Sequence, residues 1–326
     1  MPRFSVVIPN WNGERFLETC FEALRRQDMQ DFETILVDNG STDGSLRLVA
    51  ERYPEVRTVQ LERNAGFACA VNEGIRASSA PLIALLNNDT EADSCWLSAL
   101  DRASHDFPEA DFFACKMLDF QNRTVIDSCG NAMSWSGKAY KIGEGEQDGL
   151  VWSQGSFVFG ACAGAAAYRK RLFEKIGTFD ETFVTYLEDV DIDFRAQLAG
   201  SRCRFVPKAK VYHIGSATSG KGSEFGFRMA AKNHFHLIGK NFPARFLRWN
   251  LGKLIYAEAR LIAAAVRDGY LSAYIQGLRG FLHERGHMLS ERRRIQFTRI
   301  ATDGYLEELI EPTFAFTTVS KAIRGK

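Results

Sequence analysis

The first hundred residues alternate between short apolar runs and amphipathic segments, and this alternation restricts the possible folds more than any other feature. The apolar runs are rich in β-branched residues and nearly continuous: FSVVIP (4–9), FETILVD (32–38), VRTVQL (56–61) and PLIALLN (81–87). Such runs are typical of parallel strands that are covered on both faces. The segments between them have helical periodicity, over 14–27, 44–53 and 67–78. Strands and helices in this order predict an open, doubly wound sheet.

The pattern becomes looser after residue 110 and helical towards the end of the chain. Small apolar residues over 160–170 and the segment 111–117 indicate strands, whereas 119–157 is punctuated by glycine and serine. A helix is predicted over 186–200, followed by strand-like segments at 203–207 and 209–215. The sequence therefore divides into an α/β part, residues 1–227, and a part of amphipathic helices, residues 228–326.

Charge is balanced over the whole chain but unevenly distributed along it. The 326 residues have a formal net charge of +1, yet residues 228–326 hold 17 Lys and Arg against 8 Asp and Glu. We therefore expect the C-terminal part to face something anionic. Seven scattered cysteines without a CxxC pair argue against a disulfide framework or a zinc module and favour a reducing cytosol. No apolar run reaches the length of a membrane span, and the apolar part of residues 1–13 is too short for a signal peptide.

Polar side chains follow each of the four predicted N-terminal strands. The strand ends are Pro9–Asn12, Asp38–Ser41, Arg63–Gly66 and Asn87–Asp89. Ligands bind to sheets of this kind beyond the carboxyl ends of the strands. One aspartate after a strand is most often a turn former or a helix cap. Four polar strand ends together predict a ligand site.

The predicted site suits a nucleoside diphosphate, although the common phosphate-binding motifs are missing. The chain has no GxGxxG after its first strand and no GxxxxGK[ST]. The other way to hold a pyrophosphate is a divalent cation bound by carboxylates, which neutralises the leaving group. Asp89, directly after the fourth strand, is placed for that role.

Five motifs in order resemble those of the GT-A glycosyltransferases of family 2, with the closest likeness to a bacterial rhamnosyltransferase-like branch. They lie within about residues 3–240 and read SVVIPNWNG, LVDNGSTDGS, RNAGFACAVNEGI, LLNNDTE and YLEDVDIDFR. The resemblance implies a Rossmann-like, mostly parallel sheet flanked by helices, here with a C-terminal helical extension. It also implies that residues 1–110 bind the nucleotide sugar and that residues 111–227 bind the acceptor.

The resemblance assigns donor-binding roles to residues at the strand ends and on the helix that follows the third strand. Asp38 would hydrogen-bond the base, and Asn72 would lie near the diphosphate. The full set of implied donor-binding residues is Pro9, Trp11, Asp38, Asn64, Gly66, Asn72, Asn87 and Asn88.

The sequence Asn87-Asn88-Asp89 stands where the family carries its DxD motif. Asp89 would be the member that binds Mg²⁺ or Mn²⁺, and His213 would complete the metal site, although a histidine at a strand end is more often structural. Asn87 replaces the first aspartate and removes one negative charge, so we expect weaker metal binding and leave strict metal dependence open. The hydroxyl- and glycine-rich residues 213–223, with Lys221, predict a flexible loop that closes over the phosphates.

The pair Glu188-Asp189 would supply the other half of the site. An inverting transfer needs a carboxylate that takes the proton of the attacking acceptor hydroxyl. The resemblance indicates Asp189 as this base and Glu188 as a residue that positions the acceptor. Alternatively, both acids simply favour a helix N-terminus. Asp191 and Asp193 are expected to be solvated, with Arg195 as a partner.

One further motif, HERGH (283–287), matches the HExxH pattern of zinc proteases. A third ligand is not apparent nearby, and Arg285 together with Arg292–Arg294 would repel a cation. We interpret this segment as part of a basic surface helix.

The sequence thus predicts a cytoplasmic inverting glycosyltransferase that acts on a hydroxyl of a glycan or lipid-linked glycan of the cell envelope, with deoxythymidine-diphosphate rhamnose as a candidate donor. Residues 228–326 are expected to contact the inner face of the cell membrane or a second copy of the chain, and no nucleic-acid partner is expected. Two alternatives stay open. The first is a nucleotidyltransferase, which would be expected to carry a Gly-rich loop with a basic residue after the first strand. The second is a catalytically silent nucleotide-sugar-binding subunit, and the intact LEDVD argues against it.

Overall fold

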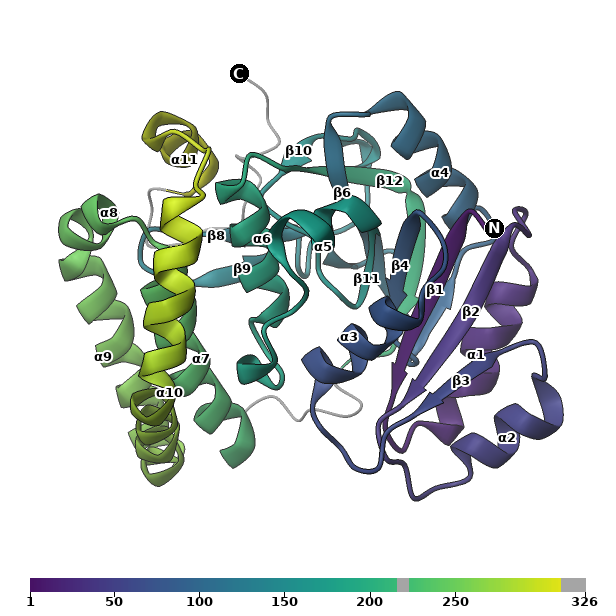
Figure 1. The fold of residues 1–326 in the computed structure, drawn as a ribbon, viewed down its shortest axis with the longest axis horizontal. Coiled ribbons are helices and arrows are strands. Elements are labelled where there is room, and N and C mark those ends of the chain that lie inside the picture. Colours follow the sequence, from purple (N-terminus) through teal and green to yellow (C-terminus); the bar gives the residue numbers. More distant parts are fainter. Residues whose placement is uncertain (216–222, 312–326) are drawn as a thin grey trace.

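A large sheet runs through the described part of the chain, residues 1–215 and 223–311 of a computed structural model (Figure 1). Its strands follow one another in the order β10-β12-β6-β11-β4-β1-β2-β3, while β5 pairs with β12 and β7 pairs with β6. The strands are β1 Phe4–Asn10, β2 Phe32–Asp38, β3 Arg57–Gln60, β4 Leu82–Leu86, β5 Thr90–Ala92, β6 Ala110–Asp119, β7 Ile126–Ser128, β10 Phe157–Val158, β11 Ala165–Arg169 and β12 Arg202–His213. A separate hairpin pairs β8, Asn131–Met133, with β9, Ala139–Lys141.

The first four strands are parallel, which confirms the alternation predicted for the first hundred residues. They are connected by α1, Glu14–Arg25, α2, Ser45–Arg52, and α3, Phe67–Ala77. Val6 and Ile8 of β1 pack in one hydrophobic cluster with residues of α1, whereas Val7 packs in another cluster with residues of α3. Because both faces of these strands are covered by helices, their sequences are apolar throughout.

The second half of the sheet contains a strand of opposite direction and one long strand for which the sequence predicted two separate strands. β11 lies antiparallel between β4 and β6. β12 runs parallel to β6 from residue 202 to residue 213, with a shift of register between Val206 and Lys210. Pro207 lies at this shift and has no N–H to donate, which explains why two strand-like segments are one interrupted strand.

The remaining helices cover the sheet and form a separate group on one side of it (Figure 1). Near the sheet these are α4 Trp96–Asp106, α5 Lys170–Ile176 and α6 Glu188–Leu198, with the short 3₁₀ helices η1 Leu150–Ser153 and η2 Glu181–Phe183. The C-terminal group consists of α7 Glu224–Asn241, α8 Ala244–Trp249, α9 Leu251–Arg267, α10 Leu271–Phe297 and α11 Asp303–Leu309. Within the described ranges, every helix is too short or too polar to cross a membrane.

The C-terminal helices share a hydrophobic core with the α/β part of the chain. Phe194 of α6 packs in one cluster with Leu237 and Phe242, and Ile295 of α10 belongs to the same cluster. The predicted boundary at residue 227 falls inside α7. These helices are therefore joined to the helix that carries Asp189 through a common interior.

Candidate active site

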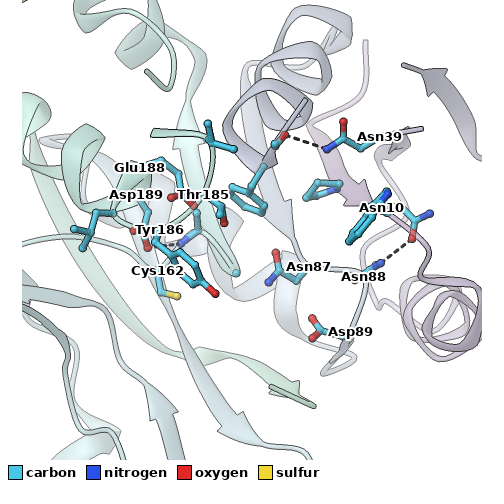
Figure 2. Close-up of a pocket in the computed structure, with 18 of the residues that line it drawn as sticks. Asn10, Asn39, Asn87, Asn88, Asp89, Cys162, Thr185, Tyr186, Glu188 and Asp189 are labelled. Atoms are coloured by element: carbon cyan, nitrogen blue, oxygen red, sulfur yellow. Dashed lines mark hydrogen bonds between the residues drawn. The ribbon is translucent and has the colours of Figure 1, made fainter. Parts of the chain in front are cut away.

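A cavity of about 680 Å³ lies at the carboxyl edge of the parallel strands. Figure 2 shows the asparagine-rich strand ends on one side of it and Glu188 with Asp189 on the other. All but two of the predicted site residues line it, namely Pro9, Trp11, Asn64, Gly66, Asn87, Asn88, Asp89, Glu188, Asp189 and His213. Residues that are distant in sequence thus converge where ligands bind to sheets of this type.

Asp38 and Asn72 are the two predicted residues that do not line the cavity. Asp38 is 1% exposed and accepts hydrogen bonds from Asn10 Nδ2 (3.1 Å) and from the Ser41 N–H (3.0 Å). The Asn72 amide both donates to and accepts from the backbone of Phe179 (2.9 Å each). Asp38 therefore fixes the side chain of Asn10, which lines the cavity, and Asn72 links α3 to the segment before η2. The resemblance had implied a contact of Asp38 with the base and of Asn72 with the diphosphate.

Hydrogen bonds within two pairs of asparagine side chains order the side of the cavity that the strand ends form. Asn88 Nδ2 donates to Asn10 Oδ1 (2.7 Å), and Asn39 Nδ2 donates to Asn64 Oδ1 (3.0 Å). Asn10 and Asn39 line the cavity as well, although neither was in the predicted set. Both stand directly after a predicted strand, so the signal that identified their neighbours applied equally to them.

The pairing of β5 with β12 brings Asp89 and His213 together. Thr90 lies opposite His213 in this antiparallel pair, and His213 Nε2 is 3.4 Å from Asp89 Oδ1. His213 Nδ1 is 2.9 Å from Asp127 Oδ2, and Asp127 also pairs with Lys141 Nζ at 2.8 Å. Burial lowers the pKa of His213, but the hydrogen bonds and charges of Asp127 and Asp89 outweigh burial and raise it to about 9.

Two buried side-chain oxygen atoms at the cavity fit a divalent cation. Asp89 Oδ1 and Asn87 Oδ1 accept no hydrogen bond of normal geometry within the described ranges, although His213 Nε2 lies 3.4 Å from Asp89 Oδ1 as an ion-pair partner. Hard cations such as Mg²⁺ and Mn²⁺ bind oxygen ligands of this kind. The residues that the structure describes include no cluster of three or more His, Cys, Asp or Glu side chains that could hold a metal ion. A cation bound here would therefore need further ligands from the diphosphate or from water. Residues 216–222, with the predicted phosphate loop and Lys221, lie outside the described residues.

Asp189 is anchored at the first turn of α6, on the opposite side of the cavity. Its Oδ2 accepts hydrogen bonds from Asn131 Nδ2 (3.1 Å) and from the Ala163 N–H (3.3 Å), and its Oδ1 accepts from the Val190 N–H (2.8 Å). The same Asn131 amide donates to Asp193 Oδ2 at 2.9 Å. The carboxylate is therefore held in one orientation while its residue stays partly accessible from the cavity.

Glu188 is more deeply buried than its neighbour Asp189. Its side chain is buried at the cavity, and Oε2 has no hydrogen-bond partner among the described residues. Burial, with a further contribution from the charge of Asp189, raises the pKa of Glu188 to about 8. At neutral pH this carboxyl group is mostly protonated and can donate a hydrogen bond into the cavity.

The segment that precedes α6 has an unusual backbone. Val184, Tyr186 and Leu187 have φ angles of 63°, 68° and 67°, in the region that residues with a Cβ rarely adopt. Asn233 of α7 holds this segment, because its Nδ2 lies 2.8–2.9 Å from three carbonyl oxygens, those of Phe183, Thr185 and Tyr186. Backbone strain of this kind persists only where surrounding structure fixes it.

Gly66 allows the strained segment to lie over the strand ends. It has a φ of 94°, and a Cβ at this position would lie 2.7 Å from both Cγ1 and the carbonyl oxygen of Val184. Any larger residue would clash with that backbone. Gly66 therefore shapes the cavity through the space that it leaves free.

Asp191 and Asp193 are buried, so their predicted exposure to solvent is wrong. Both are 0% exposed, and Asp191 accepts hydrogen bonds from Arg195 Nε and Asn241 Nδ2, each at 2.8 Å. The Lys240 ammonium group lies 2.9 Å from Asp191 as well. Arg195 is thus a partner, as predicted. The exposure was misjudged because α7 covers Asp191 and supplies the opposite charge, while Asp193 accepts hydrogen bonds from Asn131 Nδ2 (2.9 Å) and the Ala161 N–H (3.1 Å).

The HExxH segment takes part in contacts between α10 and its surroundings. Glu284 lies 3.0 Å from both Lys232 Nζ and His236 Nε2, and His287 Nε2 lies 3.2 Å from Asp180. These pairs involve the side chains that a zinc site would need. The segment was predicted to be part of a basic surface helix, and Glu284 on it pairs with the buried side chains of Lys232 and His236.

Several cavity residues were not identified from the sequence, among them Lys141, Cys162, Thr185, Tyr186 and Phe225. Lys141 reaches the cavity through the β8–β9 hairpin, a pairing that the Gly- and Ser-rich sequence of this region does not reveal. Burial raises the pKa of the Cys162 thiol to about 12, so this group stays protonated at neutral pH.

Comparison with known proteins agrees with this arrangement of fold and site. The sequence model of the family "Glycosyl transferase family 2" matches residues 5–177. N-acetylglucosaminyl-diphospho-decaprenol L-rhamnosyltransferase of Mycobacterium tuberculosis is 25% identical over 294 residues, which cover 79% of this chain and 91% of that protein. The uncharacterized glycosyltransferase EpsJ of Bacillus subtilis is 21% identical over 258 residues, 77% of this chain and 70% of that protein.

Solved structures of GT-A glycosyltransferases share the fold. GalNAc-T7 with UDP, GalNAc and Mn²⁺ has a TM-score of 0.64 at 15% identity, over 88% of this chain and 58% of that one. The mannosyltransferase PcManGT of Pyrobaculum calidifontis, in complex with GDP-Man and Mn²⁺, has a TM-score of 0.53 at 19% identity, over 91% and 86%. The predicted GT-A fold, a mostly parallel sheet flanked by helices with a C-terminal helical extension, is thereby confirmed.

Proposed function

Because the chain belongs to glycosyltransferase family 2, we propose that it transfers a sugar from a nucleoside diphosphate to a hydroxyl group of a glycan or lipid-linked glycan, with inversion at the anomeric carbon. The observation that carries this proposal is the cavity with two chemically different sides. One side offers asparagines and the buried carboxylate of Asp89, and the other offers the anchored carboxylate of Asp189.

The nucleotide would lie against the strand ends. Pro9 and the indole of Trp11, which is 41% exposed, are proposed to pack against the base, with Asn64 and Gly66 near the base and ribose. Asp38 would act through the hydrogen bond that it accepts from Asn10.

A divalent cation, Mg²⁺ or Mn²⁺, would be held by Asp89 and by the imidazole of His213, which would have to release its proton, together with the diphosphate. When bound, such an ion neutralises the charge that develops on the departing diphosphate. Asn87 and Asn88 would face the same group as neutral amides. One carboxylate fewer than in the usual motif implies a weaker dependence on metal.

The acceptor would approach from the side of α6. Its hydroxyl oxygen attacks the anomeric carbon, the bond from that carbon to the diphosphate oxygen breaks, and the hydroxyl proton moves to Asp189. The hydrogen bonds from Asn131 and Ala163 fix Asp189 Oδ2, and the protonated carboxyl group of Glu188 can donate to an oxygen of the acceptor. Asp189 is thus the proposed base and Glu188 the proposed positioning residue.

The candidate donor is deoxythymidine-diphosphate rhamnose, and the candidate acceptor is a lipid-linked glycan of the cell envelope. Support comes from the Mycobacterium tuberculosis relative, whose name describes rhamnosyl transfer to N-acetylglucosaminyl-diphospho-decaprenol. The enzyme would then work in the cytoplasm, at the inner face of the cell membrane. Self-association through residues 228–326 stays the alternative role for the C-terminal helices.

A panel of nucleotide sugars tests this proposal. Thermal unfolding of the full chain would be followed with deoxythymidine-diphosphate rhamnose, UDP-glucose, UDP-N-acetylglucosamine and GDP-mannose, each with Mn²⁺, with Mg²⁺ or with a chelator. We expect one donor class to raise the melting temperature and to release nucleoside diphosphate slowly by hydrolysis. Binding without any hydrolysis or transfer would support the silent binding subunit. Release of pyrophosphate from a nucleoside triphosphate and a sugar phosphate would support the nucleotidyltransferase.

A further inference from the structure

The outward face of α9 carries an apolar stripe that no described part of the chain covers. Leu251, Ile255, Ala259, Ile262 and Val266 follow each other at intervals of three or four residues and are all exposed. The exposed fractions of Ile255 and Val266 are 60% and 57%. The inward face of α9 is apolar as well, so a helix of this kind needs apolar surroundings on two sides. Figure 1 shows α9 at the outer edge of the C-terminal helices.

Basic side chains border this stripe, whereas the one acidic residue of α9 is directed inward. Lys253, Arg260 and Arg267 recur every seven residues and lie on the same side of the helix. Arg267 is ion-paired with the exposed Asp268 (2.6 Å), so the positive charge of this side comes from Lys253 and Arg260. Glu258 accepts hydrogen bonds from His234 (2.9 Å) and from the Tyr274 hydroxyl group in the interior. The exposed surface of α9 therefore combines apolar residues with positive charge.

Two exposed aromatic residues accompany the stripe. Trp249 at the end of α8 is 63% exposed, and Tyr256 on α9 is 49% exposed. Tryptophan and tyrosine favour the boundary between lipid headgroups and acyl chains. An apolar stripe with a basic border and flanking aromatic residues is typical of helices that lie in the plane of a membrane surface.

We propose that the outward face of α9 docks the protein on an anionic phospholipid surface. Leu251, Ile255, Ile262 and Val266 would enter the acyl boundary, and Lys253 and Arg260 would face the headgroup phosphates. A second copy of the chain is the less favourable occupant. In a two-fold dimer the same face meets itself, and its basic border would then approach an identical basic border.

The docking surface is connected to the candidate active site through α7. Phe227 packs against Tyr270 with ring centroids 5.3 Å apart, and it belongs to the cluster that contains Leu261 and Ala265 of α9. Phe225, two residues earlier on α7, lines the active-site cavity. Helix α7 thus contacts both α9 and the cavity, and it would connect a membrane at α9 with the site where a lipid-linked acceptor has to bind. Only this last link rests on the proposed function.

Vesicle flotation with the full chain tests the docking surface. The protein would be mixed with vesicles of phosphatidylcholine alone or with phosphatidylglycerol added. The variants are the double substitution Ile255→Glu/Val266→Glu and the control Leu150→Glu, which changes an 88% exposed leucine of η1. Because all three positions are exposed, we expect unchanged melting temperatures. We expect the wild type and the control to float with the anionic vesicles, and the double variant to lose roughly tenfold or more of its binding.

Several results would overturn the proposal. Equal flotation of the double variant and the wild type would exclude the α9 stripe as the docking surface. Failure of the wild type to bind anionic vesicles would exclude a membrane role. A wild-type dimer in light scattering that the double variant converts to a monomer would assign the face to self-association. None of these measurements uses sugar transfer, so failure of the proposed function would be detected separately.

Discussion

At the scale of single residues, Asn87 is expected to determine how strongly donor binding depends on a divalent cation. Its Oδ1 is buried at the cavity and, like Oδ1 of Asp89, accepts no hydrogen bond from the described residues. The substitution Asn87→Asp adds a negative charge without a change of shape. We expect it to raise the gain in donor affinity on addition of Mn²⁺ by roughly tenfold, because a second carboxylate strengthens binding of a hard cation.

Titration calorimetry with and without a chelator measures this effect, with the wild type as reference. If Asn87→Asp binds the donor with the same metal dependence as the wild type, a cation does not bind beside this residue.

Glu188 should make the stability of the protein depend on pH. Its carboxyl group has an ordinary pKa of 4.5 and a pKa of about 8 in the folded state, mainly because it is buried. Between these values the folded protein holds a proton that the unfolded chain has released. The free energy of unfolding should therefore fall as pH rises from about 5 to 8, by on the order of 1 kcal/mol per pH unit from this group.

Urea denaturation of the wild type and of Glu188→Gln at several pH values isolates this contribution. We expect the wild type to lose stability relative to the variant as pH rises. Parallel pH profiles for the two proteins would show that Glu188 has an ordinary pKa.

Site residues that stand at strand ends or within motifs could be predicted from the sequence, whereas site residues that depend on contacts between distant segments could not. Asp89, His213 and Asp189 line one cavity, as the order of the motifs implied. Asn233 has no motif of its own, and its contact with the strained segment exists only because α7 packs there. Lys141 depends in the same way on a hairpin pairing.

At the scale of elements, the segment 184–187 and α7 act as one unit. The amide of Asn233 contacts three carbonyl oxygens around residues whose φ angles are positive. In Asn233→Ala the strained backbone should relax and shift Glu188 and Asp189. We expect the transfer rate to fall roughly 10- to 100-fold, because small displacements of reacting groups have effects of this size. Nucleotide affinity should change little, because the strand ends are untouched.

Asn250→Ala is the matched control for this substitution. Asn250 is also a buried asparagine, and its amide donates to a helical carbonyl oxygen, that of Phe246 (3.1 Å), within the C-terminal helices. Loss of stability is expected in both variants and loss of turnover only in Asn233→Ala. Equal turnover of the two variants would remove Asn233 from the positioning of the base.

The elements themselves were predictable where local composition determines them. The N-terminal strands and helices follow from continuous apolar runs and helical periodicity, both of which reflect burial by neighbours close in sequence. β12 was divided because Pro207 interrupts its hydrogen bonds. The surroundings of α6 were misjudged because Asp191 is buried by α7, which follows later in the chain, and Asp193 is hydrogen-bonded to Asn131 and Ala161, which precede it.

At the scale of the whole molecule, the C-terminal helices are part of the folded unit that holds the site. Lys240 of α7 is 0% exposed and lies between Asp180 and Asp191. Removal of residues 228–326 would take Lys240 and Asn241 away from Asp191, which would keep Arg195 as its partner, and would expose Phe194. Removal of one partner from a buried ion pair costs about 3–5 kcal/mol. We therefore expect residues 1–227 not to unfold cooperatively.

Circular dichroism and thermal melting of this fragment, compared with the full chain, measure the effect. A cooperative transition of residues 1–227 near that of the full chain, together with retained nucleotide binding, would show that the α/β part folds independently.

Asp189→Asn tests the central claim, that this cavity transfers sugars with Asp189 as the base. The rate of nucleoside diphosphate release should be measured with donor and acceptor for the wild type, for Asp189→Asn and for Asp28→Asn, which changes an exposed carboxylate elsewhere. We expect Asp189→Asn to lower turnover by roughly 10³-fold while nucleotide affinity stays unchanged, because the amide keeps the shape but cannot accept the proton. Turnover close to that of Asp28→Asn would contradict the account.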